Sequence, residues 1–243
     1  MRSIFLKEIH TFFRSLIGYI VIGGFLLITG LLLFVFPDTS LLEYPYASLA
    51  QFFELAPGIF LFLIPAITMR SFAEEWQAGT FELLATKPLT DLDIILGKFF
   101  AAVFLVAFAL IPTFLYVYTL YQLGSPPGSI DMGAIRGSYL GLLLLGSAFV
   151  AIGLFASALT TNQIVAFLLG TFLCFMVQWG FFYVSKLPLF VGIWDDLVQK
   201  LGIDYHYRSI SRGIIDTRDL LYFISVVVFF LALTRSVQER RKW

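Results

Sequence analysis

The chain has 243 residues, of which 59% are hydrophobic and only 13% are charged, and its mean hydropathy is +0.90. Soluble domains are about 45 to 50% apolar and about 25% charged, so this composition excludes a soluble domain and indicates an integral membrane protein. Sixteen basic and sixteen acidic residues leave no net charge, which argues against nucleic acid as a partner.

The first predicted element is an amphipathic helix before the first membrane span. Its apolar side chains share one helical face: Phe5, Leu6, Ile9, Phe12 and Phe13. Its polar side chains share the other face: Lys7, His10, Thr11 and Arg14. The pattern predicts an interfacial helix, although a solvated start to span one fits the same residues. The following apolar run is too long for a signal-peptide core and lacks a small-residue cleavage site, so we expect it to be retained.

Six runs are long and apolar enough to cross the ~30 Å hydrocarbon core, which takes roughly 20 helical residues. They predict an all-α integral membrane protein with a single membrane-spanning domain over residues 1–243. The six spans lie near 16–36, 46–69, 99–121, 138–159, 163–185 and 219–235. The fourth and fifth are separated by the polar residues 160–163. Pro57 and Pro65 are expected to kink or break span two.

Six spans place both termini on one side of the membrane, and the positive-inside rule indicates which side. With cytoplasmic termini, ten basic residues lie in inner segments and six in outer segments. Five of those six lie between residues 186 and 218, and this stretch opposes the assignment. We therefore expect a multi-pass protein with both termini in the cytoplasm.

Residues 70–98 form a charged segment between spans two and three. Residues 71–78 predict a short helix with Phe72 and Trp76 on one face. We expect Glu74, Glu75 and Gln77 to point away from that face, and Gly79 to permit a turn.

The rest of the charged segment carries further helix signals. Thr80 is predicted to cap a second short helix through Leu84, and Pro88 ends that element. Thr90 and Asp93 form a capping-box pattern at the start of span three. The segment is thus predicted to be a bent hairpin of defined shape. Composition alone favours an ordinary surface hairpin whose aromatic side chains lie among lipid headgroups.

A structured outer loop is predicted between spans five and six. Its apolar side chains recur at helical spacing: Trp194, Leu197, Val198 and Leu201. They predict a short helix in the outer interface or over the bundle. Its basic residues can pair with three carboxylates: Asp195, Asp196 and Asp204. Asp216 and Asp219 are predicted to cap span six.

Two polar residues are candidates for a translocation path. Glu54 is the one ionisable residue expected within a span, although the outer interface fits it too. Gln178 either lines a path or makes an interhelical hydrogen bond. A passive channel or a structural membrane subunit is the alternative function, although no ring of charges supports a channel.

An intramembrane enzyme is the less favoured alternative. Both histidines, His10 and His206, lie outside the predicted spans. A metalloprotease site within the spans would therefore lack a histidine ligand, and a serine protease site would lack a histidine base. Gly97 and Lys98 superficially match the end of a phosphate-binding loop. However, Leu92 stands at the position of the required glycine, so we expect no ATP site in this chain.

Three blocks of the sequence resemble one protein family. Residues 68–98, TMRSFAEEWQAGTFELLATKPLTDLDIILGK, closely resemble the signature of type-2 ABC-exporter permeases: an Arg, a Glu-rich turn, Gly-Thr, Leu-Leu, Pro and Gly-Lys. Residues 205–243 and the opening from residue 7 are similar to permeases associated with gliding motility. The resemblance implies a non-enzymatic permease subunit in the bacterial inner (cytoplasmic) membrane. It would couple ATP hydrolysis to export or to the gliding-motility machinery.

The resemblance also implies partners and contact residues. ATP and magnesium would bind a separate ABC ATPase subunit, and a second permease copy or a homologous permease would complete the complex in the lipid bilayer. The residues that match the family's ATPase-contacting element are Arg70, Phe72, Glu74, Glu75, Trp76, Gly79, Thr80 and Glu82. Two carboxylates would pair with basic partner residues, and Trp76 would anchor the contact. The loop between spans five and six would form an external lid. No catalytic residue, metal site or bound cofactor is expected in this chain.

Overall fold

A computed structural model describes residues 1–42, 48–80, 90–124, 126, 128, 130–187 and 193–241 of the chain. Every regular element in these residues is helical. The first half contains α1 (Arg2–Arg14), α2 (Leu16–Phe34), η1 (Pro37–Thr39), α3 (Ala50–Thr68), α4 (Ala73–Gln77), α6 (Asp91–Leu110), η2 (Ile111–Thr113) and α7 (Phe114–Leu123). The second half contains α8 (Met132–Leu159), α9 (Gln163–Phe175), the π-helical turn η3 (Met176–Gly180), α10 (Phe181–Ser185), α11 (Ile193–Gln199), α12 (Ile203–Ile210) and α13 (Thr217–Arg241).

The six predicted spans are confirmed as helices that are long and apolar enough to cross a membrane. Their helical runs are Leu16–Phe34, Ala50–Gln77, Asp91–Leu123, Met132–Leu159, Gln163–Ser185 and Thr217–Arg240. The structure also confirms the predicted polar break between the fourth and fifth spans, where the Asn162 side chain caps α9. The predicted start of span two near Tyr46 lies outside the described residues, and α3 itself begins at Ala50.

Span two continues through both of its prolines, so the predicted alternative of a broken helix is wrong. A proline within a helix deprives the carbonyl four residues earlier of its usual N–H donor. For Pro57 that carbonyl belongs to Phe53, and the Tyr207 hydroxyl donates to it at 2.8 Å. A side chain of α12 therefore replaces the missing backbone bond, as expected for a polar group buried away from water.

The long helix α8 forms the centre of the bundle and contacts α3, α6, α9 and α13. Small residues permit these close approaches, as is common between membrane helices. A Cβ atom on Gly153 would overlap the Thr68 Oγ1 atom of α3, and one on Gly141 would overlap Ile210 of α12. Side chains of α8 such as Leu142, Leu145 and Phe149 are completely buried.

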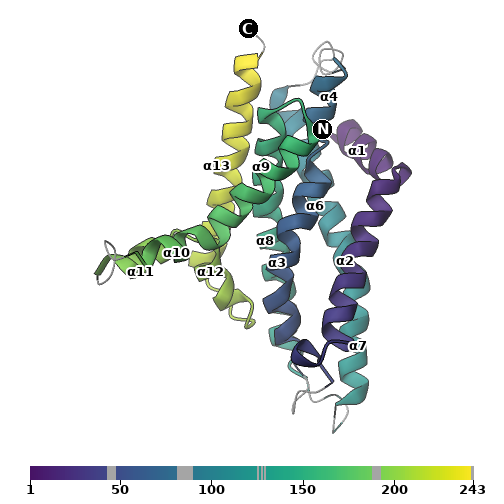
Figure 1. Ribbon diagram of the computed structural model, residues 1–243, viewed down its shortest axis with the longest axis vertical. Helices are drawn as coiled ribbons and strands as arrows, with labels where there is room; N and C mark the ends of the chain where they lie inside the picture. The colour runs from purple at the N-terminus through teal and green to yellow at the C-terminus, as the bar shows by residue number, and fades with distance from the viewer. Residues whose placement is uncertain are drawn as a thin grey trace.

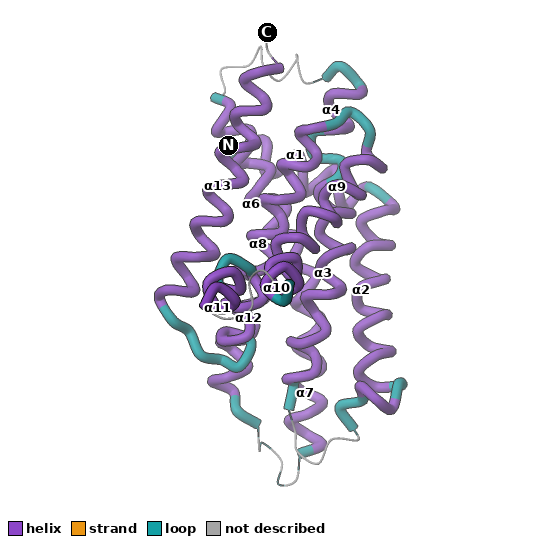
Figure 2. The backbone as a smooth tube through the Cα atoms, turned by 60° about the vertical axis from the view of Figure 1, so that its left-hand side comes forward, coloured by secondary structure: helices purple, strands orange, loops and turns teal. Residues whose placement is uncertain are grey.

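Figure 1 shows both termini, α1 and α4 toward one end of the bundle, whereas α2 finishes and α7 runs toward the other end. The predicted N-terminal helix is confirmed as α1. In both views α10, α11 and α12 lie near mid-height, because span five tilts out of the bundle instead of continuing to the far end (Figures 1 and 2). The external lid that the resemblance implies stays a prediction.

The loop between spans five and six is structured, as predicted. The helix around Trp194 is confirmed as α11, and α12 is an additional helix that the prediction missed. The predicted carboxylate pairs form: Lys186 with Asp195, Lys200 with Asp196, and Arg208 with Asp204. Asp216 accepts a hydrogen bond from the Arg218 backbone N–H, so it caps α13, whereas Asp219 contacts His206 Nδ1 at 2.7 Å.

Candidate functional site

The polar turn after span two is a short helix with a defined end. Helix α4 ends at Gln77, and the chain turns at Gly79, whose φ of 65° lies in the left-handed region that favours glycine. The Gly79 N–H donates to the Trp76 carbonyl at 3.3 Å, and the Thr80 N–H donates to the Glu75 carbonyl at 3.1 Å. This pair of bonds is a Schellman motif, so the predicted turn at Gly79 is confirmed. The predicted helix from Thr80 to Leu84 lies outside the described residues except for Thr80. Glu82 and Pro88 also lie outside them.

One buried serine of α8 holds the start of α4. Ser157 Oγ accepts hydrogen bonds from the backbone N–H groups of Phe72 at 3.0 Å and Ala73 at 3.1 Å. It also donates to the Met69 carbonyl at 3.0 Å. The side chain is fully buried, and it satisfies backbone groups that the helix start would leave without partners. Ser157 was not predicted as a site residue.

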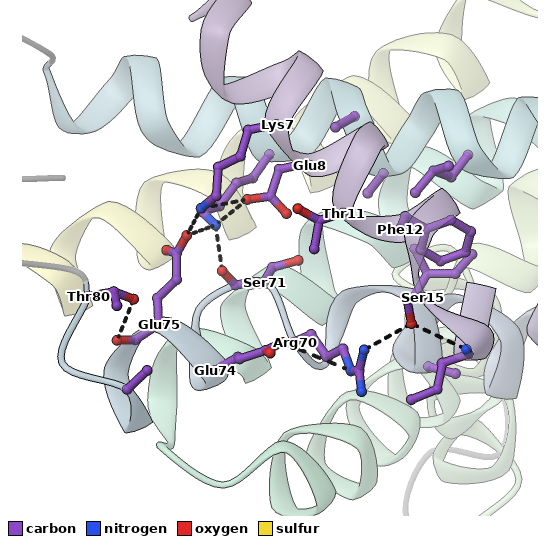
Figure 3. Close-up of a pocket in the computed structure, with 18 residues that line it drawn as sticks. Lys7, Glu8, Thr11, Phe12, Ser15, Arg70, Ser71, Glu74, Glu75 and Thr80 are labelled. Carbon is purple, nitrogen blue, oxygen red and sulfur yellow. Dashed lines mark hydrogen bonds and ion pairs between the residues drawn. The ribbon is translucent and has the colours of Figure 1, made fainter. Parts of the chain in front are cut away.

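A network of four charged side chains joins α1, α4 and α6. The Lys98 ammonium lies 2.7 Å from a Glu8 carboxylate oxygen and 2.9 Å from a Glu75 carboxylate oxygen. It also donates to the Ser71 carbonyl at 2.6 Å, so each of its three N–H groups has an acceptor. Lys7 approaches the same Glu75 oxygen at 2.6 Å. Figure 3 shows Lys7, Glu8 and Glu75 pointing toward one another.

The network is balanced in charge and largely withdrawn from water. It contains two ammonium groups and two carboxylates, and the Lys98 side chain is only 1% exposed. Buried charges are stable only when they are paired, and every charge of this set has a partner of opposite sign. The second Glu75 carboxylate oxygen, Oε2, is buried without a hydrogen-bond partner among the described residues. Thr90 and Asp93 form the predicted capping box that starts α6, the helix that carries Lys98. Three elements distant in sequence are therefore joined at one point.

The neighbouring carboxylates change the acidity of Lys7. Partial burial lowers the pKa of its ammonium, but the hydrogen bond and charge of Glu75, together with Glu8, raise it more. The net pKa lies above the ordinary value of 10.5. Lys7 is therefore charged at neutral pH, and its contribution to holding α1 is lost only as the pH rises past its raised pKa.

The structure corrects the predicted faces of α4. Glu75 was expected to point away from the apolar face with Glu74, but it is buried and pairs within the chain. Phe72 is also fully buried, and Trp76 is half-buried against the core. Neither Phe72 nor Glu75 is thus displayed for a partner. Glu74 is the exposed carboxylate of this helix.

The exposed surface of α4 and its turn contains three of the predicted contact residues, Glu74, Gly79 and Thr80. Glu74 is about half exposed, and the exposed stretch continues from Gln77 through Gly79 to Thr80. Arg70 donates to Ser15 at the junction of α1 and α2, at 3.1 Å, and lies 4.0 Å from Glu74. Beneath this surface, a cavity of about 320 Å³ separates α1 from the α3–α4 turn (Figure 3).

The two residues predicted for a translocation path lie in one separate cavity of about 420 Å³. Glu54 comes from the second turn of α3 and Gln178 from η3. The interhelical hydrogen bond considered for Gln178 is not formed within the described residues, because both side-chain polar atoms are buried without partners there. The path itself remains a prediction.

These features define a class: a multi-pass helical membrane protein with a polar, internally braced turn between spans two and three. The chain belongs to the ABC-2 family of transporter proteins, whose model matches residues 3–234. It is therefore a membrane component of an ABC transporter, and members of this family normally work with an ABC ATPase. No curated protein matches the chain.

Proposed function

We propose that this chain is the permease subunit of an ABC transporter and that α4 receives the motion of a separate ATPase subunit. The observation that carries the proposal is the bracing of α4 by three parts of the bundle. Glu75 joins it to α1 and α6 through Lys7 and Lys98, and Ser157 joins its first turn to α8.

The bracing explains how a small displacement of α4 would reach the membrane spans. Loosely held side chains would absorb a push, whereas a network of paired and mostly buried charges transmits it because its members have few alternative positions. Lys98 lies in the first half of α6, and Ser157 lies in the last turn of α8. A push on α4 would thus act on spans three and four together, and α1 would move with them.

The proposed contact surface is the exposed part of the turn. Glu74 offers a carboxylate to basic residues of the ATPase, where Gln77 and Thr80 would add polar contacts. ATP and magnesium would be bound by the ATPase, and a second copy or a homologous permease would complete the membrane part. Both termini and α4 would face the cytoplasm of a bacterium. The free energy of ATP hydrolysis would drive either export or a gliding-motility machine.

Glu74→Lys is expected to weaken the capture of the ATPase about tenfold while leaving the fold intact. The side chain is about half exposed, so its reversal should change the free energy of unfolding by less than about 0.5 kcal/mol. The measurement is affinity purification of the full chain in mild detergent, with the co-purified ATPase quantified by mass spectrometry. Glu75 must stay intact, because its reversal would break the internal network.

Glu239→Lys on α13 is the matched control, because Glu239 is about equally exposed and pairs with Arg235 four residues earlier. It should retain the ATPase at the level of the unmodified chain. If the Glu74 and Glu239 variants capture equal amounts of the ATPase, Glu74 is not part of the contact surface. The absence of any ATPase from the unmodified purification would contradict the proposed function.

A further inference from the structure

The second cavity has the size and composition of a small-molecule site. It lies between the start of α3, the turn η3 and α12 with the residues that follow it, and its volume is about 420 Å³. Binding sites for small ligands commonly measure about 300 to 1,000 Å³ and contain a few polar groups from several elements. Here those groups are Glu54, Gln178 and Arg212, together with the pair Asp204 and Arg208.

Gln178 is the group that points to a ligand. Its side chain is buried, with 1% exposure of the residue, and neither its Nε2 nor its Oε1 atom has a hydrogen-bond partner among the described residues. Buried amides nearly always have partners, so one that lacks both a donor and an acceptor calls for an explanation. Its place in a π-helical turn adds to the case, because such turns within α-helices are frequent at functional sites.

The charges around Gln178 are of both signs. Asp204 and Arg208 lie 2.7 Å apart and neutralise each other. Glu54 and Arg212 have no ion pair within the described part of the chain, and both are exposed. The cavity therefore offers one free carboxylate, one free guanidinium and one uncommitted amide.

The walls that carry these charges are fixed relative to each other. Tyr207 of α12 is buried, and its hydroxyl donates to the Phe53 carbonyl, next to Glu54 in α3. The bond takes the place of the backbone bond that Pro57 prevents. The part of α3 that carries Glu54 and the segment after α12 that carries Arg212 are thus held together before any ligand binds, which lowers the entropic cost of binding.

We propose that this cavity binds a small zwitterionic group that contains an ammonium and either a phosphate or a carboxylate. The ammonium would face Glu54 and the anionic end would face Arg212. Gln178 would accept a hydrogen bond from the ammonium through Oε1 and donate one to the anionic oxygens through Nε2. The inference rests on the proposed function and deepens it, because it names the chemical class of substrate that the permease would move. An ethanolamine phospholipid headgroup and a free amino acid share this chemistry.

The test measures binding to the purified full chain in detergent, without any ATPase. In one arm, native mass spectrometry compares retained phosphatidylethanolamine with phosphatidylglycerol, which lacks the ammonium. In the other arm, calorimetry compares alanine with propionate and with ethylamine, each of which lacks one charge. We expect at least a tenfold preference for the zwitterion in one of the two arms, which identifies the source. Absence of a preference in both arms would overturn the proposal.

Three variants test whether the zwitterion binds in this cavity. Glu54→Gln, Arg212→Gln and Gln178→Leu should each weaken zwitterion binding about tenfold or more, which corresponds to about 1.4 kcal/mol and to the loss of one hydrogen bond to a charged group. Glu239→Gln and Arg218→Gln are matched controls at exposed positions outside the cavity and should leave binding unchanged. Equal effects of cavity and control variants would overturn the assignment.

Gln178→Leu also separates binding from packing. Leucine removes a buried amide that has no partners, so the ligand-free variant should melt at a higher temperature while it loses affinity for the zwitterion. A change in melting temperature with unaltered zwitterion binding would show a structural role only and would contradict the proposal. The outcome is independent of ATPase capture, so the proposed function and this inference can fail separately.

Discussion

Lys98→Met is expected to lower the free energy of unfolding by about 3 kcal/mol, which is the lower end of the range for breaking a buried ion pair. The substitution removes the cation that Glu8 and Glu75 share and leaves them with Lys7, which is about half exposed. It also deprives the Ser71 carbonyl of its donor. Denaturant unfolding of the purified chain in detergent, followed by fluorescence, measures the change.

Lys200→Met provides the comparison for Lys98→Met. Lys200 pairs with Asp196 four residues away, and both side chains are well exposed, so its substitution should leave the free energy of unfolding nearly unchanged. The Lys98 variant should also capture less ATPase, because α4 would no longer be joined to α6. If the two lysine variants unfold alike, the network does not brace the turn.

Ser157→Ala is expected to destabilise the chain by roughly 2 to 6 kcal/mol, since two buried backbone donors would each lose a partner at about 1 to 3 kcal/mol. Those donors are the N–H groups of Phe72 and Ala73, at the start of α4. The exposed surface of α4 stays chemically unchanged. Hydrogen exchange of the 70–80 segment should therefore rise, and ATPase stimulation by the permease should fall.

Ser147→Ala tests whether any serine of α8 would have the same effect. The Ser147 hydroxyl bonds to the Leu143 carbonyl of its own helix, at 2.7 Å, and the structure gives it no long-range bond in the described residues. We expect little change in stability or in exchange near α4. A similar response from both serine variants would mean that Ser157 does not anchor the turn.

Local signals in the sequence were sufficient to predict much of this fold. Span positions follow from runs of apolar residues, and the start of α6 follows from Thr90 and Asp93, which are three residues apart. The end of α4 follows from Gly79 alone, because few other residues adopt a positive φ. Each of these features depends on neighbours in the chain, so no knowledge of tertiary contacts was needed.

Long-range partners could not be predicted in the same way. Glu8 and Lys98 are 90 residues apart, and Phe72 and Ser157 are 85 apart, so their contacts depend on how the helices pack. The same holds for Glu54 and Gln178, which were chosen as polar residues in apolar spans and are found in one cavity. The position of α10–α12 at mid-height likewise depends on the tilt of span five.

Two errors had signals in the sequence that were not used. Glu75 lies three residues after Phe72, next to Trp76, so helical spacing places it on the same face as those aromatic residues. The prediction sorted these residues by polarity and overlooked their positions. Similarly, Ile203, Tyr207 and Ile210 recur at i, i+4 and i+7, which is the buried stripe of the missed helix α12.

The central claim is that α4 faces the cytoplasm, where an ATPase can reach it, and cysteine labelling tests it most directly. Gln77→Cys would be treated with a membrane-impermeant maleimide in intact cells and in inverted membrane vesicles, with Gln122→Cys at the opposite end of the bundle as the control. Both positions are exposed, and the native Cys174 is fully buried and should not react. The account predicts that Gln77→Cys is labelled in inverted vesicles and Gln122→Cys in intact cells. Labelling of Gln77→Cys from outside intact cells would contradict it.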